Sequence, residues 1–199
     1  MTLRAAKRPD SVGDHAAENL VFIRQAMERS ATFTTIPGAG GVAMGVVALA
    51  ASAVAARQPT SDRWLMVWLV AAALAAVLGL LAMVRKAKQG GNTLTGATGR
   101  RFALGMAAPL VAGAAITYGL WTARTFTVMA PAWLLLYGAG VLTGGIFSVP
   151  LVRAIGMCFM ALGIAAIVTP PEWADVWLAI GFGGLHVGFG AYIARNYGG

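Results

Sequence analysis

Long apolar stretches separated by short polar segments fill the sequence after its first 35 residues. Each stretch has roughly the 17 to 25 residues that an α-helix needs to cross the hydrocarbon of a bilayer. A membrane β-barrel would instead need short strands of alternating polarity, and residues 71–78 (AAALAAVL) do not alternate. The chain is therefore predicted to be all-α, with a single domain over 36–199 that forms a bundle of six transmembrane helices. The predicted spans cover about residues 36–56, 64–84, 102–121, 130–147, 151–168 and 174–194.

The first 35 residues contain no such stretch and are predicted to form a cytoplasmic tail. Asp14 is a suitable N-cap residue, and Ala16, Leu20, Ile23 and Met27 fall along one side of a helix that begins there. We therefore expect an amphipathic helix over about residues 14–30. It either lies in the headgroup region with its apolar side toward the lipid, packs under the bundle, or binds a cytoplasmic partner. A removable secretory signal is not expected, because no apolar core with a small-residue cleavage site occurs here.

The composition supports a membrane protein. Hydrophobic residues make up 58% of the chain and charged residues 11%, whereas soluble domains contain about 25% charged residues. The net charge of +8 does not indicate a nucleic-acid partner, because that function needs basic residues clustered on a folded soluble surface. The lipid bilayer is the expected partner, and nucleic acid is not.

The distribution of Lys and Arg predicts the orientation, since cytoplasmic loops hold these residues preferentially. Twelve of the 15 fall on the side that holds both ends of the chain, so both termini are predicted to be cytoplasmic. The Ala- and Arg-rich composition suggests a bacterium, and hence the bacterial cytoplasmic (inner) membrane. The three remaining residues on the opposite side are Arg57, Arg63 and Arg124, which share it with Asp62, Glu172 and Asp175.

Glycine at helical spacing is the main packing signal inside the predicted spans. Lipid provides no hydrophobic drive between helices, so close backbone approach must supply the contact. These pairs predict tight contacts, either within the bundle or with a second copy or another membrane protein. The pairs four residues apart are Gly41 with Gly45, Gly140 with Gly144, and Gly184 with Gly188.

The spans lack the residues of most intramembrane chemistry. They contain no carboxylate for an ion pump, no lysine for a Schiff base, and no histidine other than His186. A Ser-His-Asp triad would need a carboxylate at the depth of His186, and none is there. The protein is therefore expected to be non-enzymatic and to use no cofactor.

His186 is the residue in the spans whose charge would change near neutral pH, and it is the first candidate for a ligand or polar site. Counting 1.5 Å per residue places it at about the depth of Cys158 on the preceding span. The simplest interpretation is a hydrogen bond between helices, with Tyr137 or Thr143 among the available partners. The alternatives are a polar lining for a solute path or a proton-sensitive switch. A soft-metal site is a weaker alternative, and its residues would be Met44, Met157, Cys158 and His186.

A second candidate lies at the cytoplasmic ends of the last two spans. Ser148, Arg153 and Arg195 converge there and favour a cytoplasmic anion or a lipid headgroup. The alternative is that both arginines extend to headgroups without specificity. The six tryptophans cluster toward the other side, where an aromatic belt at the membrane surface explains them.

Two functions follow from these patterns. The first is a non-enzymatic accessory, regulatory or structural subunit of a membrane assembly or homo-oligomer, acting through its Gly-rich helix faces. The second is a small-solute transporter or channel with its path near His186.

Overall fold

A computed structural model describes residues 19–21, 36–89 and 96–197. The chain divides into two compact units, Met1–Ala31 and Thr32–Gly199. In the first unit, the described residues 19–21 are helical, and Leu20 and Val21 are exposed. The rest of the predicted amphipathic helix lies outside the described residues.

The second unit is built from helices, and no strand occurs in the part of it that the structure describes. Within the described ranges, five helical segments are long and apolar enough to cross a membrane, the last of them running over Pro171–Asn196. The prediction of an all-α protein with membrane-spanning helices is therefore confirmed. The elements are α2 (Gly38–Ala55), α3 (Ser61–Gln89), α4 (Ala97–Thr122), α5 (Met129–Gly145), α6 (Pro150–Ile167), η1 (Pro171–Trp173), α7 (Ala174–Leu178), η2 (Ala179–Leu185) and α8 (His186–Tyr197).

Several helix boundaries differ from the predicted spans. α3 continues five residues beyond Val84, and α4 begins five residues before Phe102, in both cases through polar sequence. Lys, Arg and Gln are good helix formers, so these helices continue where the hydropathy that limited the prediction has already fallen. α5 is apolar but has only 17 residues and is shorter than the five spanning segments.

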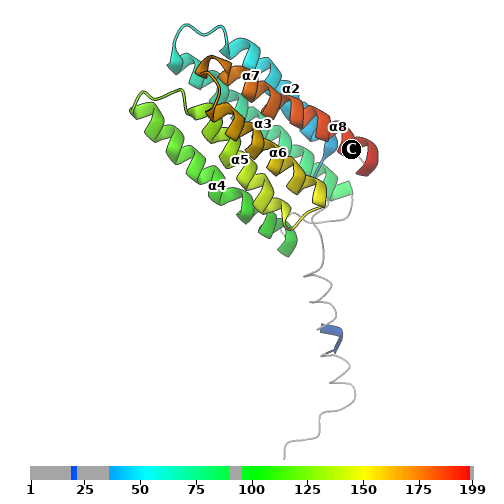
Figure 1. Ribbon diagram of the computed structural model, residues 1–199. Coiled ribbons are helices and arrows are strands. Elements are labelled where there is room, and N and C mark those ends of the chain that lie inside the picture. Colours follow the sequence, from blue (N-terminus) through cyan, green and yellow to red (C-terminus); the bar gives the residue numbers. More distant parts are fainter. Residues whose placement is uncertain (1–18, 22–35, 90–95, 198–199) are drawn as a thin grey trace, which may run out of the picture. The chain divides into compact units, whose positions relative to one another are not determined.

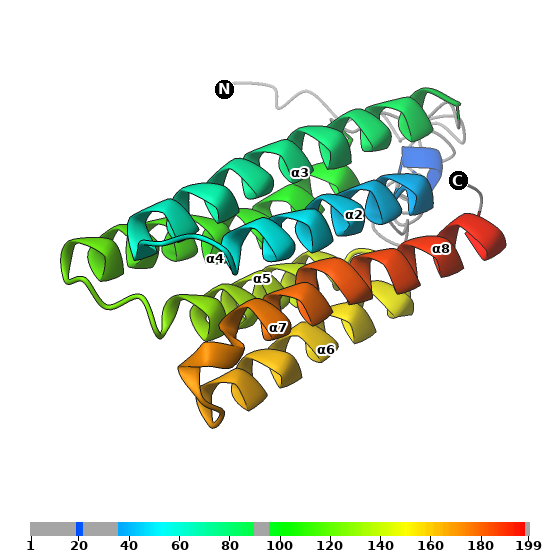
Figure 2. The same cartoon turned by 90° about the horizontal axis from the view of Figure 1, so that it is seen from above.

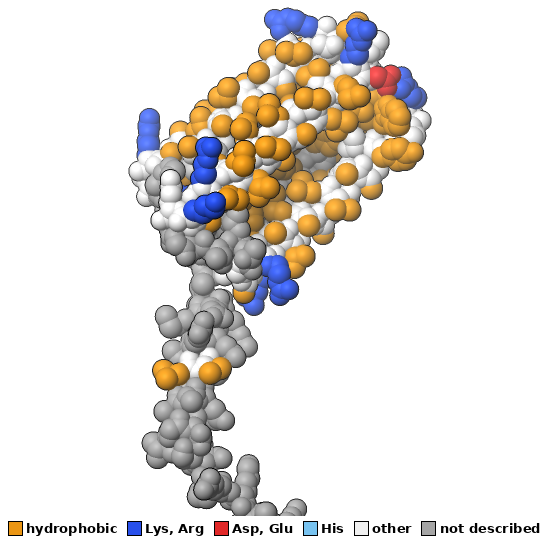
Figure 3. All heavy atoms as spheres, turned by 180° about the vertical axis from the view of Figure 1, so that it is seen from behind, with side chains coloured by type: hydrophobic (Ala, Val, Ile, Leu, Met, Phe, Trp, Pro, Cys, Tyr) orange, Lys and Arg blue, Asp and Glu red, His pale blue; other side chains and the backbone are white. Residues whose placement is uncertain are grey.

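The helices run up and down and lie roughly side by side (Figures 1 and 2). α5 lies between α4 and α6, and α2 packs against α3, η2 and α8. The helix formed by α7, η2 and α8 contacts α2, α5 and α6, and so joins the group of α2 and α3 to the group of α4, α5 and α6. Hydrophobic side chains cover the length of the helices, while Lys and Arg side chains lie near the helix ends (Figure 3). This is the surface expected of a bundle surrounded by lipid.

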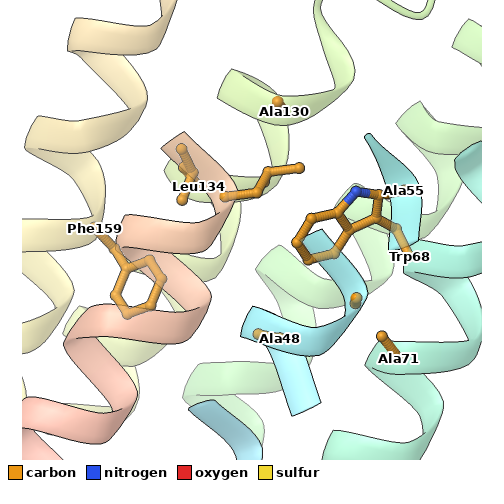
Figure 4. Packing of buried hydrophobic residues seen from close by; sticks show 9 residues of the cluster. Ala48, Ala55, Trp68, Ala71, Ala130, Leu134 and Phe159 are labelled. Atoms are coloured by element: carbon orange, nitrogen blue, oxygen red, sulfur yellow. The ribbon is translucent and has the colours of Figure 1, made fainter. Parts of the chain in front are cut away.

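The largest buried cluster joins five helices through small and aromatic residues. Figure 4 shows Trp68 of α3 beside the alanines of α2, with Leu134 of α5 and Phe159 of α6 on the other side. Leu134 and Phe159 are fully buried. A second cluster forms around Phe102, Val141 and Val152. It joins α4, α5 and α6 where α4 and α6 begin and α5 ends.

Glycine allows the backbones to approach closely at two of the three predicted pairs. A β-carbon on Gly45 would lie 2.7 Å from the carbonyl oxygen of Gly183, so α2 and η2 can pack only with glycine here. A β-carbon on Gly144 would lie 3.1 Å from the carbonyl oxygen of Phe102 in α4. The third pair is different, because a β-carbon on Gly188 would meet no atom within 4 Å.

Candidate functional site

His186 is the first residue of α8 and follows directly after η2, which is a π-helix of seven residues. π-Helical turns are rare and occur frequently at functional sites. Three glycines lie in this segment, and a β-carbon on Gly181 would lie 2.5 Å from the Leu134 side chain. The π-helix itself was not predicted, because no local sequence pattern indicates its wider turn.

Both ring nitrogens of His186 make hydrogen bonds. Nδ1 lies 3.0 Å from the carbonyl oxygen of Phe182, and Nε2 lies 2.8 Å from the hydroxyl oxygen of Tyr137. A carbonyl oxygen only accepts, so Nδ1 carries the proton and donates to Phe182. In a neutral imidazole Nε2 then carries no proton, and it accepts a hydrogen bond from the hydroxyl of Tyr137. This arrangement uses the neutral imidazole and links α5 to the last spanning helix.

Aromatic rings surround this pair. Phe159 of α6 packs edge-on against both Tyr137 and His186, with ring centroids 4.8 and 5.3 Å away. The ring of Phe182 lies 5.1 Å from that of Tyr137, also edge-on. An apolar environment of this kind strengthens the two hydrogen bonds and makes an unpaired polar atom costly. The site can hold helices in register, and its histidine has no lone pair or N–H left for a further ligand.

The structure brings His186 and Tyr137 together and places the other candidates elsewhere. Cys158 is half-buried on α6, and its neighbour Phe159 takes the position against the imidazole. Thr143 instead faces α4, where its hydroxyl lies 2.7 Å from the carbonyl oxygen of Gly105.

The residues of the soft-metal alternative also point to different places. The Met44 sulfur packs at the α2–α3 contact, where it lies 2.8 Å from the position of a β-carbon on Gly79. Met157 is 55% exposed on the outside of α6. Among the described residues, no group of three His, Cys, Asp or Glu side chains could hold a metal ion.

The second candidate site is dispersed at the ends of α5, α6 and α8. Ser148 is buried just after α5, while Arg153 and Arg195 are exposed. The stem of Arg153 passes over Gly145, since its Cγ lies 3.2 Å from the position of a β-carbon there. Both guanidinium groups are therefore available to the membrane surface. This end of the bundle also holds the end of α3 and the start of α4, and we call it the basic end.

A polar network at the opposite end was missed in the sequence. Asp175 accepts hydrogen bonds at Oδ1 from the indole nitrogens of Trp64, at 2.8 Å, and Trp68, at 3.0 Å. The hydroxyl of Ser52 donates to the main-chain oxygen of the same residue. Trp64 also stacks on Trp133, with centroids 5.6 Å apart. These tryptophans hold α2, α3, α5 and α7 together, and an aromatic belt does not describe their role. We call this end the tryptophan end.

At the tryptophan end, an ion pair connects α3 to the loop after α4. Asp62 accepts two hydrogen bonds from Arg124, at 2.7 and 2.9 Å, and one from the indole of Trp121. The hydrogen bond and charge of Asp62 raise the pKa of Arg124 above its usual value. Arg124 adopts a positive φ of 56° at the end of α4, a position that usually holds glycine.

Comparison of the chain with family models, with curated proteins and with solved structures gave no match. The class of protein rests on its own helices, which are those of an α-helical membrane protein.

Proposed function

We propose that this protein is a non-enzymatic accessory or structural subunit that assembles in the membrane through the outward face of η2 and α8. The observation that carries the proposal is the free space at Gly184 and Gly188. A β-carbon on Gly188 would meet nothing, and one on Gly184 would meet only the main-chain oxygen of Ala179 at 3.9 Å. The bundle leaves this pair open while using the other two pairs for its own contacts.

The residues around the open pair extend it into a surface. Ile180 precedes Gly184 by one turn, Tyr192 follows Gly188 by one turn, and both are exposed. Two glycines four residues apart between larger side chains allow a second helix to approach closely in lipid. A second copy of the chain or another membrane protein would fit against this surface.

The proposal includes six spans, with α5 as the short one. Its 17 residues rise about 26 Å at 1.5 Å per residue. The chain continues in helical turns beyond it, because the amides of Ile146, Phe147 and Ser148 bond to carbonyl oxygens three residues before them. These turns extend α5 toward the roughly 30 Å of hydrocarbon.

Six spans place the start of α2 and the end of α8 on one side, which is the basic end. The preference of Lys and Arg for cytoplasmic loops favours the cytoplasm for that side. All three acidic residues of the described part, Asp62, Glu172 and Asp175, lie at the tryptophan end. We place the protein in the inner membrane of a bacterium on this basis and on its composition.

The test is association in lipid. Gly188→Leu should weaken self-association, or co-purification of a partner, because the side chain keeps the second helix away. Gly119→Leu is the matched control, since a β-carbon on Gly119 also meets nothing within 4 Å. Energy transfer between labelled copies in vesicles measures self-association. Quantitative co-purification from native membranes measures binding of a partner. A monomeric wild type without a stoichiometric partner would contradict the proposal.

Transport is the competing outcome. If the wild type moved a defined solute across vesicles and a folded His186→Ala variant did not, the accessory role would be wrong. The neutral imidazole of His186 makes two hydrogen bonds and is surrounded by aromatic rings, which supports the accessory role instead.

A further inference from the structure

A hollow runs between α3 and α4 on the face of the bundle that Figure 3 shows. α3 packs on α2, and α4 packs on α5, so the two helices form separate walls. Short side chains dominate the middle of both: five of the six residues over 71–76 are alanine, and α4 carries Ala107, Ala108 and Gly113. The hollow therefore opens sideways toward lipid and has apolar walls.

The tryptophan end closes the hollow. The Asp62–Arg124 ion pair connects the first turn of α3 to the loop after α4. Below it, Trp133 of α5 stacks on Trp64 and donates a hydrogen bond to Thr117 of α4 at 2.8 Å. A transmembrane helix must pass from one surface of the membrane to the other, and these bridges block that path. An acyl chain ends near the middle of the bilayer, so it fits a hollow that is closed at the tryptophan end.

The basic end supplies the charge that an anionic headgroup needs. Arg85 and Lys88 lie in the last turns of α3, and Arg100 and Arg101 lie in the first turns of α4. All four are exposed. No acidic residue occurs at this end in the described part of the chain, so these charges are not neutralised by carboxylates there. Each basic residue near a membrane surface strengthens the attraction of anionic lipids.

We propose that the hollow between α3 and α4 binds an acyl chain of an anionic phospholipid, whose headgroup lies against Arg85, Lys88, Arg100 and Arg101. This site is separate from the Gly184 and Gly188 surface, and it does not depend on the assembly proposed above. It also does not depend on which side of the membrane the basic end faces.

The experiment uses the full chain in phosphatidylcholine nanodiscs that contain phosphatidylglycerol with a diazirine in mid-chain. After irradiation, peptides from both α3 and α4 should carry the label more than peptides from α6 or α8. Unlabelled phosphatidylglycerol should compete, and unlabelled phosphatidylcholine should not. Equal labelling of all helices, or equal competition by both lipids, would overturn the proposal. Cross-links between two protein copies at this face would show that a second copy occupies the hollow instead.

Paired charge variants test the headgroup contact. Arg100→Gln with Arg101→Gln should reduce the labelling of α3 and α4 by about 30-fold, given two lost basic contacts. Arg57→Gln with Arg63→Gln removes the same charge at the tryptophan end and should leave labelling unchanged. Equal effects of the two pairs would contradict a headgroup site at the basic end. The lipid competition on the wild type decides the question if either pair fails to fold.

Discussion

The hydroxyl of Thr143 in α5 lies 2.7 Å from the carbonyl oxygen of Gly105 in α4. Gly105 is four residues before Pro109, which has no N–H to bond that carbonyl within the helix. An unpaired carbonyl is costly in hydrocarbon, where no water replaces the missing donor. The neighbouring helix supplies the donor instead, and α4 continues through its proline. The same hydroxyl also lies 2.8 Å from the carbonyl oxygen of Ala139 in its own helix, so the two carbonyl oxygens share its one proton.

Thr143→Val should therefore destabilise the bundle by about 0.6 kcal/mol and by no more than about 1.7 kcal/mol, the average and the maximum measured for hydrogen bonds between membrane helices. The loss should shrink in a Pro109→Ala background, because alanine restores the N–H donor that the carbonyl oxygen of Gly105 lacks. Unfolding in mixed detergent micelles measures the stability of the wild type, the two single variants and the double variant. Thr122→Val is the control, since the Thr122 hydroxyl bonds only within its own helix. Independent effects of the two substitutions would contradict the pairing.

The contact between α5 and α6 gives a second prediction. A β-carbon on Gly156 would lie 2.6 Å from the main-chain nitrogen of Leu142, and backbone atoms cannot rotate away. Gly156→Ala should cost roughly 1 to 3 kcal/mol of unfolding free energy. Gly119→Ala is the control and should be neutral or stabilise by up to about 1 kcal/mol, because its site is open and alanine favours the helix. Similar values for the two variants would show that α5 and α6 do not depend on close approach.

The acceptor shared by two tryptophans gives a third prediction. Asp175→Ala leaves the indole N–H groups of Trp64 and Trp68 without their acceptor, and Trp68 is only 5% exposed. The cost should be about 1 to 3 kcal/mol for each N–H that stays unpaired. Asp175→Asn retains an acceptor oxygen and should lose less. Thermal unfolding followed by tryptophan fluorescence separates the two variants, and equal stability of alanine and asparagine would rule out this role.

The all-helical membrane class could be predicted from sequence because long apolar runs leave few alternatives. The direction in which each side chain points around its helix could not be predicted. Depth counting placed Cys158 level with His186, but the adjacent Phe159 faces the imidazole, because one residue rotates the side chain by about 100°. Thr143 was considered as a partner for His186 and faces α4 instead. Asp175 lies 111 residues from Trp64, and no local pattern joins them.

The hydrogen bond between Tyr137 and His186 gives the last prediction. Tyr137→Phe removes the donor and leaves Nε2 of a half-buried imidazole without a partner, so it should cost about 1 to 3 kcal/mol. Adding His186→Phe removes the unpaired nitrogen as well, and the double variant should recover most of that loss because ring shape is nearly preserved. Unfolding in mixed micelles measures the recovery. A double variant no more stable than Tyr137→Phe would show that the imidazole contributes more than this one bond. A double variant that is stable and assembles normally would identify the pair as a structural link between α5 and α8.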